Sequence, residues 1–228
     1  MADLDLTTHR GLWLCVLGAD ALELLPTDGI GWLGVDLQHG VYDVAHLPGL
    51  LRVAQVPVLA RAASQDPGHL ARVLDTGVAG VIVPGVESPA DVESLVAAVR
   101  FPPEGRRSTG LTRAVLVGGP ERPLLLPMVE TRGALETVEE IAAVPGVDGL
   151  FVGPYDLSLS LGRPGVTDAD VVAGIARVRE VTRERGLLAG AFSAHRELDP
   201  QLPADLDLVA VDTDITALRQ GVAGLLGG

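Results

Sequence analysis

The chain has a single cysteine, Cys15, among its 228 residues. One thiol cannot form an internal disulfide, and this usage fits a reducing compartment. Cys15 lies within the apolar segment 12–17, and free cysteines are usually buried in protein cores. We therefore interpret Cys15 as a core thiol rather than a nucleophile.

Basic residues are also few, and the formal net charge is −13. Nucleic acids and anionic membranes attract basic surfaces, so this charge disfavours both as partners. An anionic substrate stays open, because a few arginines or a metal ion reverse the potential inside a pocket. No apolar run approaches the ~18 residues of a membrane span. The first residues lack a basic segment followed by an apolar stretch, so we expect no signal peptide and a cytoplasmic protein.

Aromatic residues make up 3% of the chain, whereas apolar residues make up 47%. The core is therefore expected to consist of Leu, Val, Ile and Ala, as is typical of layered α/β proteins. The length suits one domain over residues 1–228, because α/β barrels run to roughly 200–250 residues as a single unit.

Short apolar runs alternate with amphipathic segments along the chain. Near-continuous apolar runs are typical of strands buried on both faces of a parallel sheet. Ser88 and Asp91 predict the start of one helix, and Thr167 and Asp170 predict another start of the same kind. An apolar stripe over residues 215–226 predicts a last helix. The expected strands are 12–17, 32–37, 56–60, 80–83, 124–129, 149–152, 188–192 and 208–211.

Eight strands alternating with helices predict a (β/α)₈ TIM barrel. A doubly wound open sheet is the alternative. The sequence has no Walker segment, which removes one common reason for such a sheet.

Polar residues follow several of the expected strands. The segment 36–40 follows the second strand, Arg61 the third, Glu130 the fifth, Asp156 the sixth, and 212–214 the eighth. The carboxyl ends of barrel strands form one rim, which is where barrel enzymes carry their sites. These residues are therefore candidates for one site.

Each candidate also has a structural interpretation. His39 and Arg61 suit a loop hydrogen bond and a rim salt bridge. Glu130 suits a helix cap and Asp156 an Asx-turn, while the acids within 212–214 are expected to cap the last helix. Taken together, the alignment of these side chains on one rim favours a site.

The chemistry that these residues suggest begins with a metal ion. Two carboxylates, Glu130 and Asp156, suit Mg²⁺ or Mn²⁺, which prefer oxygen ligands and keep open positions. A 2-oxo acid could chelate such an ion, which would act as a Lewis acid on the keto oxygen.

Loss of a proton from the adjacent carbon gives an enolate, whose charge a cation such as Arg61 would stabilise. His39 titrates near neutrality and is the candidate general base. Asp36 lies three residues before His39 and is expected to orient or polarise it.

These motifs together resemble the HpcH/HpaI aldolases, which are metal-dependent (class II) pyruvate aldolases with a (β/α)₈ barrel. The resemblance runs from about residue 12 to the C-terminus. The segments that carry it, in this order and spacing, are 36–40, 57–61, 83–87, 101–110, 128–131 and 153–158.

The resemblance implies a role for each candidate. Glu130 and Asp156 match the metal ligands, for Mg²⁺ or Mn²⁺. Arg61 matches the arginine that binds pyruvate and stabilises its enolate. His39 matches the catalytic histidine, with Asp36 as its acidic partner.

Further residues follow from the resemblance alone. Asp75 matches an acidic catalytic residue of the family's site. A contact between subunits is one way in which this residue could reach the site. The backbone of Gly153 and Pro154 matches the place where the pyruvate carboxylate binds. Met128 stands where some members have a substrate-holding Gln. The family also implies a homo-oligomer, a hexamer or trimer, whose C-terminal helix packs on a neighbour; an intrachain barrel helix explains the stripe 215–226 equally well.

Besides Met128, the chain departs from the family pattern at three places. Gln38 stands where many members have Glu, and Tyr155 replaces a small residue and would narrow the mouth of the site. The stretch 111–123 is shorter than usual. These departures bear on the acceptor half of the reaction.

The leading function is a pyruvate aldolase that cleaves or forms 4-hydroxy-2-oxo acids, with a small 2-oxo acid as substrate. The alternative is related enolate chemistry, namely citrate-synthase-like condensation, CoA-thioester condensation or lysis, or decarboxylation. The third hypothesis is a non-catalytic barrel that binds a partner. It is disfavoured because the chain keeps all four polar candidates, Arg61, His39, Glu130 and Asp156.

Overall fold

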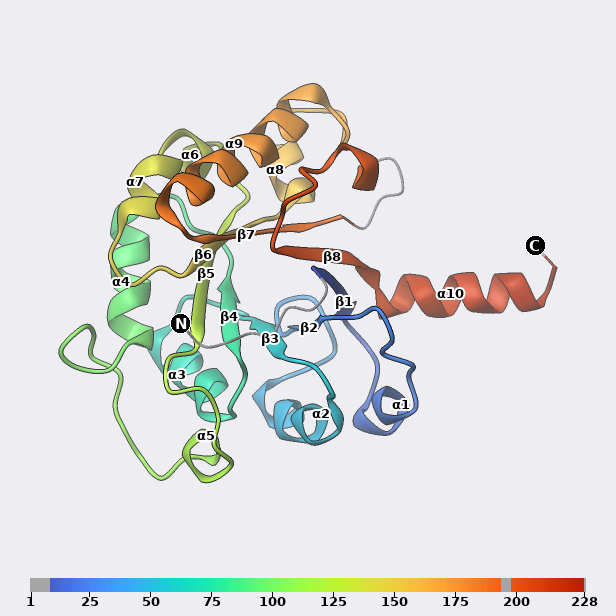
Figure 1. The fold of residues 1–228 in the computed structure, drawn as a ribbon, viewed down its shortest axis with the longest axis horizontal. Coiled ribbons are helices and arrows are strands. Elements are labelled where there is room, and N and C mark those ends of the chain that lie inside the picture. The colour runs from blue at the N-terminus through green and yellow to red at the C-terminus, as the bar shows by residue number, and fades with distance from the viewer. Residues whose placement is uncertain (1–8, 194–197, 228) are drawn as a thin grey trace.

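The computed structural model describes residues 9–193 and 198–227. In this part of the chain, eight parallel strands pair in sequence order and close into a barrel (Figure 1). The first and last strands pair with each other, so the sheet has no free edge. The predicted (β/α)₈ barrel is confirmed. Its strands are β1 (Arg10–Leu14), β2 (Trp32–Asp36), β3 (Val58–Arg61), β4 (Gly80–Val83), β5 (Leu124–Val129), β6 (Gly149–Val152), β7 (Leu188–Phe192) and β8 (Leu208–Thr213).

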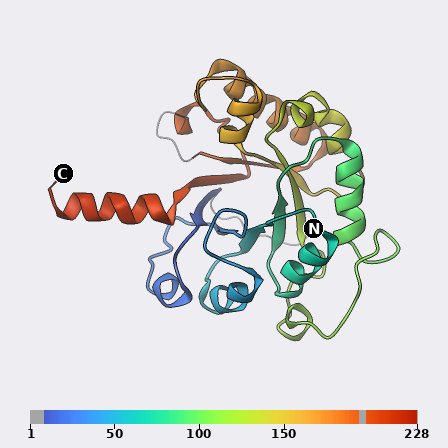
Figure 2. The ribbon, with the colours of Figure 1, turned by 180° about the vertical axis from the view of Figure 1, so that it is seen from behind.

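Helices surround the barrel, as the view from behind also shows (Figure 2). Among the described residues, none of the helices is both long and apolar enough to cross a membrane. The α-helices are α1 (Ala19–Glu23), α2 (Leu47–Val53), α3 (Pro67–Asp75), α4 (Pro89–Val99), α5 (Arg113–Leu116), α6 (Arg132–Glu136), α7 (Val138–Ala143), α8 (Pro154–Ser160), α9 (Ala169–Arg185) and α10 (Asp214–Leu225); two short 3₁₀ helices are η1 (Val44–His46) and η2 (Asp199–Gln201).

The strands β4 to β7 have the predicted bounds, but β1 was predicted too far along the chain. The N–H groups of Cys15, Val16 and Leu17 donate to the carboxylate of Asp214 at 2.8–2.9 Å instead of to a neighbouring strand. The apolar run therefore continues after the chain has left the sheet. Asp214 was expected to cap the last helix; the cap is Thr213, whose side chain accepts from the N–H of Thr216.

Smaller corrections have equally local causes. β3 begins at Val58, because Pro57 has no N–H to give to the ladder. β8 runs two residues further than predicted, because it pairs with β1 again after a register shift. The helix expected to begin at Thr167 is capped by Asp168, whose side chain accepts from the N–H of Asp170. The predicted Ser88 cap and its capping box with Asp91 are confirmed.

A G-x-G-x-x-G pattern occurs at residues 29–34, where it could suggest a dinucleotide-binding loop. The structure places residues 29–31 of this pattern directly before β2 and residues 32–34 within it. A dinucleotide loop instead lies between a strand and the helix that follows it. The pattern is therefore part of the barrel wall.

Two apolar clusters make up the core. The larger lies between the strands and the outer helices and consists of Leu, Val, Ile and Ala apart from Tyr42, much as the composition predicts. The smaller fills the barrel interior and contains Trp13, Trp32 and Phe151. The few aromatic residues are thus concentrated where a closed barrel needs bulk.

Each interior tryptophan lies opposite a glycine on the neighbouring strand. In the β1–β2 register, Gly11 pairs with Trp32 and Trp13 pairs with Gly34. A Cβ atom on Gly34 would lie 2.4 Å from Cε3 of Trp13, well inside van der Waals contact. The two indoles meet edge to face, with ring centroids 6.4 Å apart. Glycine therefore makes the space that the indoles fill.

The last helix, α10, extends away from the barrel (Figures 1 and 2). Within α10, all of whose residues are described, Asp214 alone is buried. Its apolar stripe is open to solvent: Leu218 is 51%, Val222 55% and Leu225 88% exposed. The stripe therefore does not cover this chain's own barrel.

Replacement of Gly34 by alanine should destabilise the barrel. The added methyl group has no space beside Trp13, and overpacking of this kind costs about 1–3 kcal/mol. Thermal unfolding at fixed protein concentration should show a fall in Tm of about 2–4 °C for each kcal/mol. Gly165→Ala is the matched control, because a Cβ there meets nothing within 4 Å. A Gly34→Ala protein as stable as this control would contradict the packing argument.

Candidate active site

A cavity of about 210 Å³ lies at the carboxyl end of the strands. This volume is below the roughly 300–1,000 Å³ of most small-molecule sites, so the cavity suits small substrates. Seven of the predicted site residues line it together: Asp36, His39, Arg61, Met128, Gly153, Pro154 and Asp156. The remaining lining residues are Trp13, Cys15, Phe151, Tyr155, Phe192 and Thr213.

Arg61, the last residue of β3, is held by a bidentate ion pair with Asp36, the last residue of β2. Nε of Arg61 donates to Oδ1 at 3.0 Å and Nη2 donates to Oδ2 at 2.5 Å. The two residues are direct partners in the β2–β3 register. The guanidinium also lies over the ring of Trp13, 5.4 Å from its centroid. The side chain is thus fixed on two sides.

Asp36 is buried, and both oxygens of its carboxylate accept hydrogen bonds. Oδ1 also accepts the backbone N–H groups of Gln38 and His39, and Oδ2 accepts Nε1–H of Trp13 at 3.3 Å. Burial alone would raise the pKa of Asp36, but the hydrogen bonds and charge of Arg61, with the two backbone N–H groups, lower it below its usual value. Asp36 is therefore a stable anion.

His39 is exposed at the mouth of the cavity. Asp36 was expected to orient or polarise His39, and its carboxylate accepts the backbone N–H of His39 at 3.0 Å. The contact fixes the main chain of the loop that carries the imidazole. The ionic partner of Asp36 is Arg61, a pairing that the sequence interpretation did not include.

Glu130 directly follows β5 and is buried, 7% exposed. Its Oε1 accepts the N–H of Gly85 at 2.6 Å. Burial raises the pKa of Glu130, and the charge of Asp156 raises it further. The hydrogen bond from Gly85 and the charges of Arg61 and His39 act in the opposite direction but do not cancel the rise. Thr131 caps the helix that follows, so Glu130 is not its cap.

Asp156 lies exposed in the first turn of α8. Asp156 is near enough to Glu130 for its charge to raise the pKa of that carboxyl. Gly153, three residues before Asp156, packs directly on Glu130, since a Cβ there would lie 3.0 Å from Oε2. Two carboxylates that repel each other are stabilised by a divalent cation bound between them. In the described part of the chain, no group of three or more His, Cys, Asp or Glu side chains converges. Two carboxylates suffice for an ion such as Mg²⁺, which keeps several positions for water and substrate oxygens.

The backbone at Gly153 and Pro154 offers few donors for a carboxylate. The N–H of Gly153 donates to the carbonyl of Val129 at 3.3 Å, and proline has no N–H. The next two N–H groups, of Tyr155 and Asp156, open α8, where a helix has no internal acceptors for them. These two groups are the better donors at this place.

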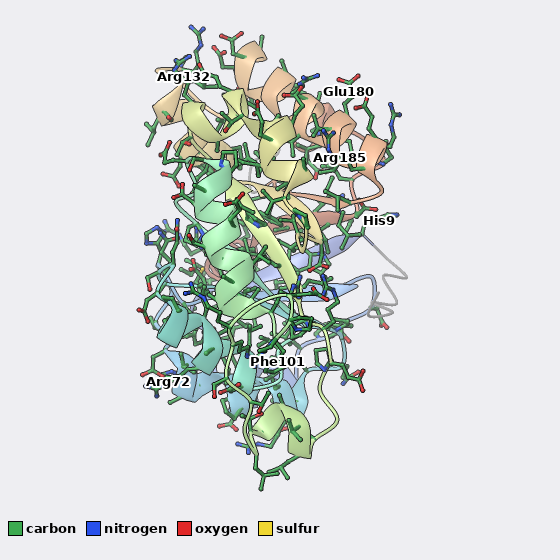
Figure 3. All side chains as sticks on the ribbon, turned by 90° about the vertical axis from the view of Figure 1, so that its left-hand side faces the viewer. His9, Arg72, Phe101, Arg132, Glu180 and Arg185 are labelled. Carbon is green, nitrogen blue, oxygen red and sulfur yellow. The ribbon has the colours of Figure 1, made fainter. Side chains whose placement is uncertain are left out.

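Asp75 does not lie at this cavity. It is the last residue of α3 and accepts a hydrogen bond from Nη2 of Arg107 at 2.6 Å. Arg107 in turn packs on the ring of Phe101, which lies below α4 in Figure 3. Within one chain, the fold therefore separates Asp75 from the other predicted residues.

The sequence interpretation missed the aromatic lining of the cavity. Trp13, Phe151 and Phe192 come from β1, β6 and β7, and all three line it. Phe192 is the last residue of a correctly predicted strand, so the strand-end argument could have found it. Cys15 also lines the cavity; burial, with the charges of Asp36 and Asp214, raises its pKa to about 12. The prediction of an unreactive, buried thiol agrees with this.

The geometry can be set beside known proteins. The model of the HpcH/HpaI aldolase/citrate lyase family matches residues 9–217. The chain belongs to this family. The hydroxypyruvate/pyruvate aldolase of Chromohalobacter salexigens is 36% identical over 236 residues, with 96% of this chain and 92% of the relative covered. As a family member, the protein is an enzyme of the aldolase and lyase class.

Solved structures of the family have the same fold. An HpcH/HpaI aldolase/citrate lyase family protein from Burkholderia cenocepacia superimposes with a TM-score of 0.87 at 31% identity, covering 96% of this chain and 93% of that one. A more distant neighbour is the protein CitE from Mycobacterium tuberculosis in complex with magnesium and pyruvate, with a TM-score of 0.57 at 20% identity, covering 91% of this chain and 87% of that one.

Asp36→Asn should destabilise the protein at neutral pH by about 3–5 kcal/mol, because Arg61 then lacks its buried counter-charge. The pKa of Asp36 is lowered in the folded state. Its contribution is therefore fully present above the unfolded value of about 3.9 and is lost as pH falls through the lower folded value. Urea unfolding of both proteins from pH 7 to pH 3 should show the difference shrinking at the acid end. The exposed Asp20→Asn is the control, and a pH-independent difference would contradict the ion-pair argument.

Proposed function

We propose that the protein is a divalent-metal-dependent aldolase that works through the enolate of pyruvate and cleaves or forms 4-hydroxy-2-oxo acids. One observation carries the proposal: a guanidinium fixed by Asp36 shares a cavity with Asp156, with Glu130 close behind. The relative in Chromohalobacter salexigens, named a hydroxypyruvate/pyruvate aldolase, supports it.

The composition supports a metal-dependent route. The 17 residues counted as Lys or Arg are all arginines, and the sequence contains no lysine. An aldolase that makes a Schiff base with its substrate needs a lysine amine. In this chain the enolate charge therefore has to be stabilised electrostatically.

Glu130 and Asp156 would hold the ion, for which we propose Mg²⁺ or Mn²⁺; bound there, it would supply Lewis-acid stabilisation of the keto oxygen. The neighbour CitE, in complex with magnesium and pyruvate, supports this choice of ion and a small 2-oxo acid as substrate. We also propose a cytoplasmic location, which the single cysteine supports because this usage fits a reducing compartment.

The chain's own residues would divide the donor half of the reaction. Arg61 uses Nε and Nη2 on Asp36, and no bond to Nη1 is found among the described residues. Nη1 can therefore donate to the substrate's keto oxygen. His39, exposed at the mouth, would take the methyl proton. Met128, 3% exposed, would close the apolar side of the donor pocket.

The alternative functions share this donor half. Condensation with a 2-oxo diacid or a CoA thioester, and decarboxylation, would also pass through an enolate at Arg61. The condensations differ from the aldol reaction in the acceptor, whereas decarboxylation releases CO₂ and needs only a proton. A screen of acceptors together with an assay for CO₂ separates them after the donor half is established.

Pyruvate in D₂O should exchange its methyl protons when the protein and Mg²⁺ or Mn²⁺ are present. Arg61→Ala should slow the exchange about 10²–10³-fold, the usual effect of removing a donor to a developing oxyanion. Each sample is stopped at a set time by chelating the metal, and the loss of the methyl signal is then measured by proton NMR.

Two variants sharpen this experiment. Arg52→Ala removes an equal charge from an exposed position of α2 and should exchange like the wild type. Arg61→Lys keeps the charge but loses the bidentate geometry, and it should also be slow. Wild-type protein that shows no exchange with any divalent ion would remove the pyruvate proposal.

We also propose that the chain forms a homo-oligomer, a trimer or hexamer, through α10. The exposed stripe of α10 is too apolar to be left in water over its whole length. A second copy is the partner that the family resemblance implies. In such an assembly Asp75, which is remote from its own cavity, would be available to the site of a neighbouring subunit.

The double variant Leu218→Glu and Val222→Glu should form a smaller assembly than the wild type, because charges replace the middle of the stripe. Size-exclusion chromatography with light scattering measures this directly. Gln220→Glu adds charge on the opposite side of α10 and should keep the wild-type mass. A monomeric wild type, or a double variant of unchanged mass, would refute the role of α10.

A further inference from the structure

The residues that line the cavity are of two kinds. Asp36, His39, Arg61 and Asp156 are polar, and the proposed donor half uses them. Trp13, Phe151, Phe192 and Tyr155 are aromatic and lie against one another, and we call these four the aromatic wall. In a chain with only 3% aromatic residues, four of them at one cavity need an explanation.

These rings form a connected series from the barrel floor to the mouth. Ring centroids of Trp13 and Phe151 are 5.8 Å apart, those of Trp13 and Phe192 5.5 Å, and those of Phe192 and Tyr155 6.5 Å. Exposure rises along the series, from 3% at Trp13 to 47% at Tyr155. Trp13 and Phe151 are committed to the barrel core. Phe192 and Tyr155 are therefore the rings that remain for a ligand.

The backbone fixes Tyr155 at the rim. It follows Pro154, which occupies the first turn of α8, and it precedes the proposed metal ligand Asp156. A group bonded to a substrate carbon held near Asp156 would therefore be within reach of the ring of Tyr155 and of Phe192 beside it. The acceptor in an aldol reaction has this position.

Charge argues against an anionic acceptor at this wall. Of the described residues that line the cavity, Arg61 is the one that is always cationic, and Asp36 already occupies two of its donors. Among the described lining residues, a phosphate or second carboxylate would meet the carboxylates of Asp36 and Asp156 and no second arginine. Burying an unpaired anion is costly, so the wall suits an uncharged group.

We propose that the acceptor is an uncharged aldehyde with an aromatic ring, which packs against Tyr155 and Phe192. This inference rests on the proposed aldolase function. The enolate carbon of pyruvate, having lost one proton to the base, forms a bond to the aldehyde carbon. The carbonyl electron pair moves to the aldehyde oxygen, which takes up a proton. The product is a 4-hydroxy-2-oxo acid with the ring on C4, and the reverse reaction cleaves it without any further reactant.

The test compares four aldehydes with pyruvate and Mg²⁺: benzaldehyde, glycolaldehyde, succinic semialdehyde and glyceraldehyde 3-phosphate. We expect kcat/KM for benzaldehyde to exceed that for the two charged aldehydes at least about tenfold, in keeping with the cost of an unpaired anion. Methyl-proton exchange of pyruvate is measured on every protein, and each kcat/KM is divided by it. This separates the acceptor half from the donor half.

Substitutions of the two rings should change the selectivity. Tyr155→Ala and Phe192→Leu should each lower the benzaldehyde-to-glycolaldehyde ratio of kcat/KM about twofold to tenfold, the usual worth of one aromatic contact. Tyr155→Phe should keep the ratio, because the ring remains. Leu159→Ala, on the same helix but away from the cavity and 74% exposed, is the matched control.

The outcomes are distinct. Intact exchange with a preference for a charged aldehyde overturns this proposal and leaves the pyruvate aldolase standing. A ratio that Tyr155→Ala and Phe192→Leu leave unchanged also overturns it. Absence of exchange in the wild type overturns the aldolase function itself and the acceptor proposal with it.

Discussion

The packing of Trp13 is the contact on which both the barrel and the site depend. Its ring fills the barrel interior because Gly34 on the neighbouring strand has no side chain. The same ring supports the guanidinium of Arg61 at 5.4 Å, and its N–H donates to Asp36. A change that displaces this indole therefore alters the core and the Arg61–Asp36 pair of the cavity together.

The Arg61–Asp36 pair follows from that arrangement. A buried carboxylate needs hydrogen-bond donors on both oxygens, and Trp13, Arg61 and the loop carrying His39 provide them. Strands β2 and β3 place the two residues directly opposite each other, so little conformational entropy is lost when the ion pair forms. The guanidinium reaches the cavity already oriented, which is what stabilisation of a developing oxyanion requires.

The sequence alone was sufficient for the fold and for most of the rim, because buried parallel strands give apolar runs that end in the polar groups of one edge. It failed at β1, where the apolar run outlasts the strand because Asp214 takes the N–H groups of residues 15–17. That contact joins positions nearly 200 residues apart and has no local signal. The pairing of Asp36 with Arg61 was missed for a related reason: it depends on the register between strands, which hydrophobic periodicity does not determine.

The absence of lysine gives the cavity its chemical character. Every fixed cation of the chain is a guanidinium, and the one at this site is neutralised by Asp36. Arg61 therefore offers directed N–H groups more than net charge. Glu130 and Asp156 leave the same region negative, and burial already raises the pKa of Glu130. An enolate formed there would add to that negative charge, so the carboxylates are useful only if they hold a cation. The electrostatics of this chain's own side chains thus support the proposed metal-dependent site in addition to the relatives.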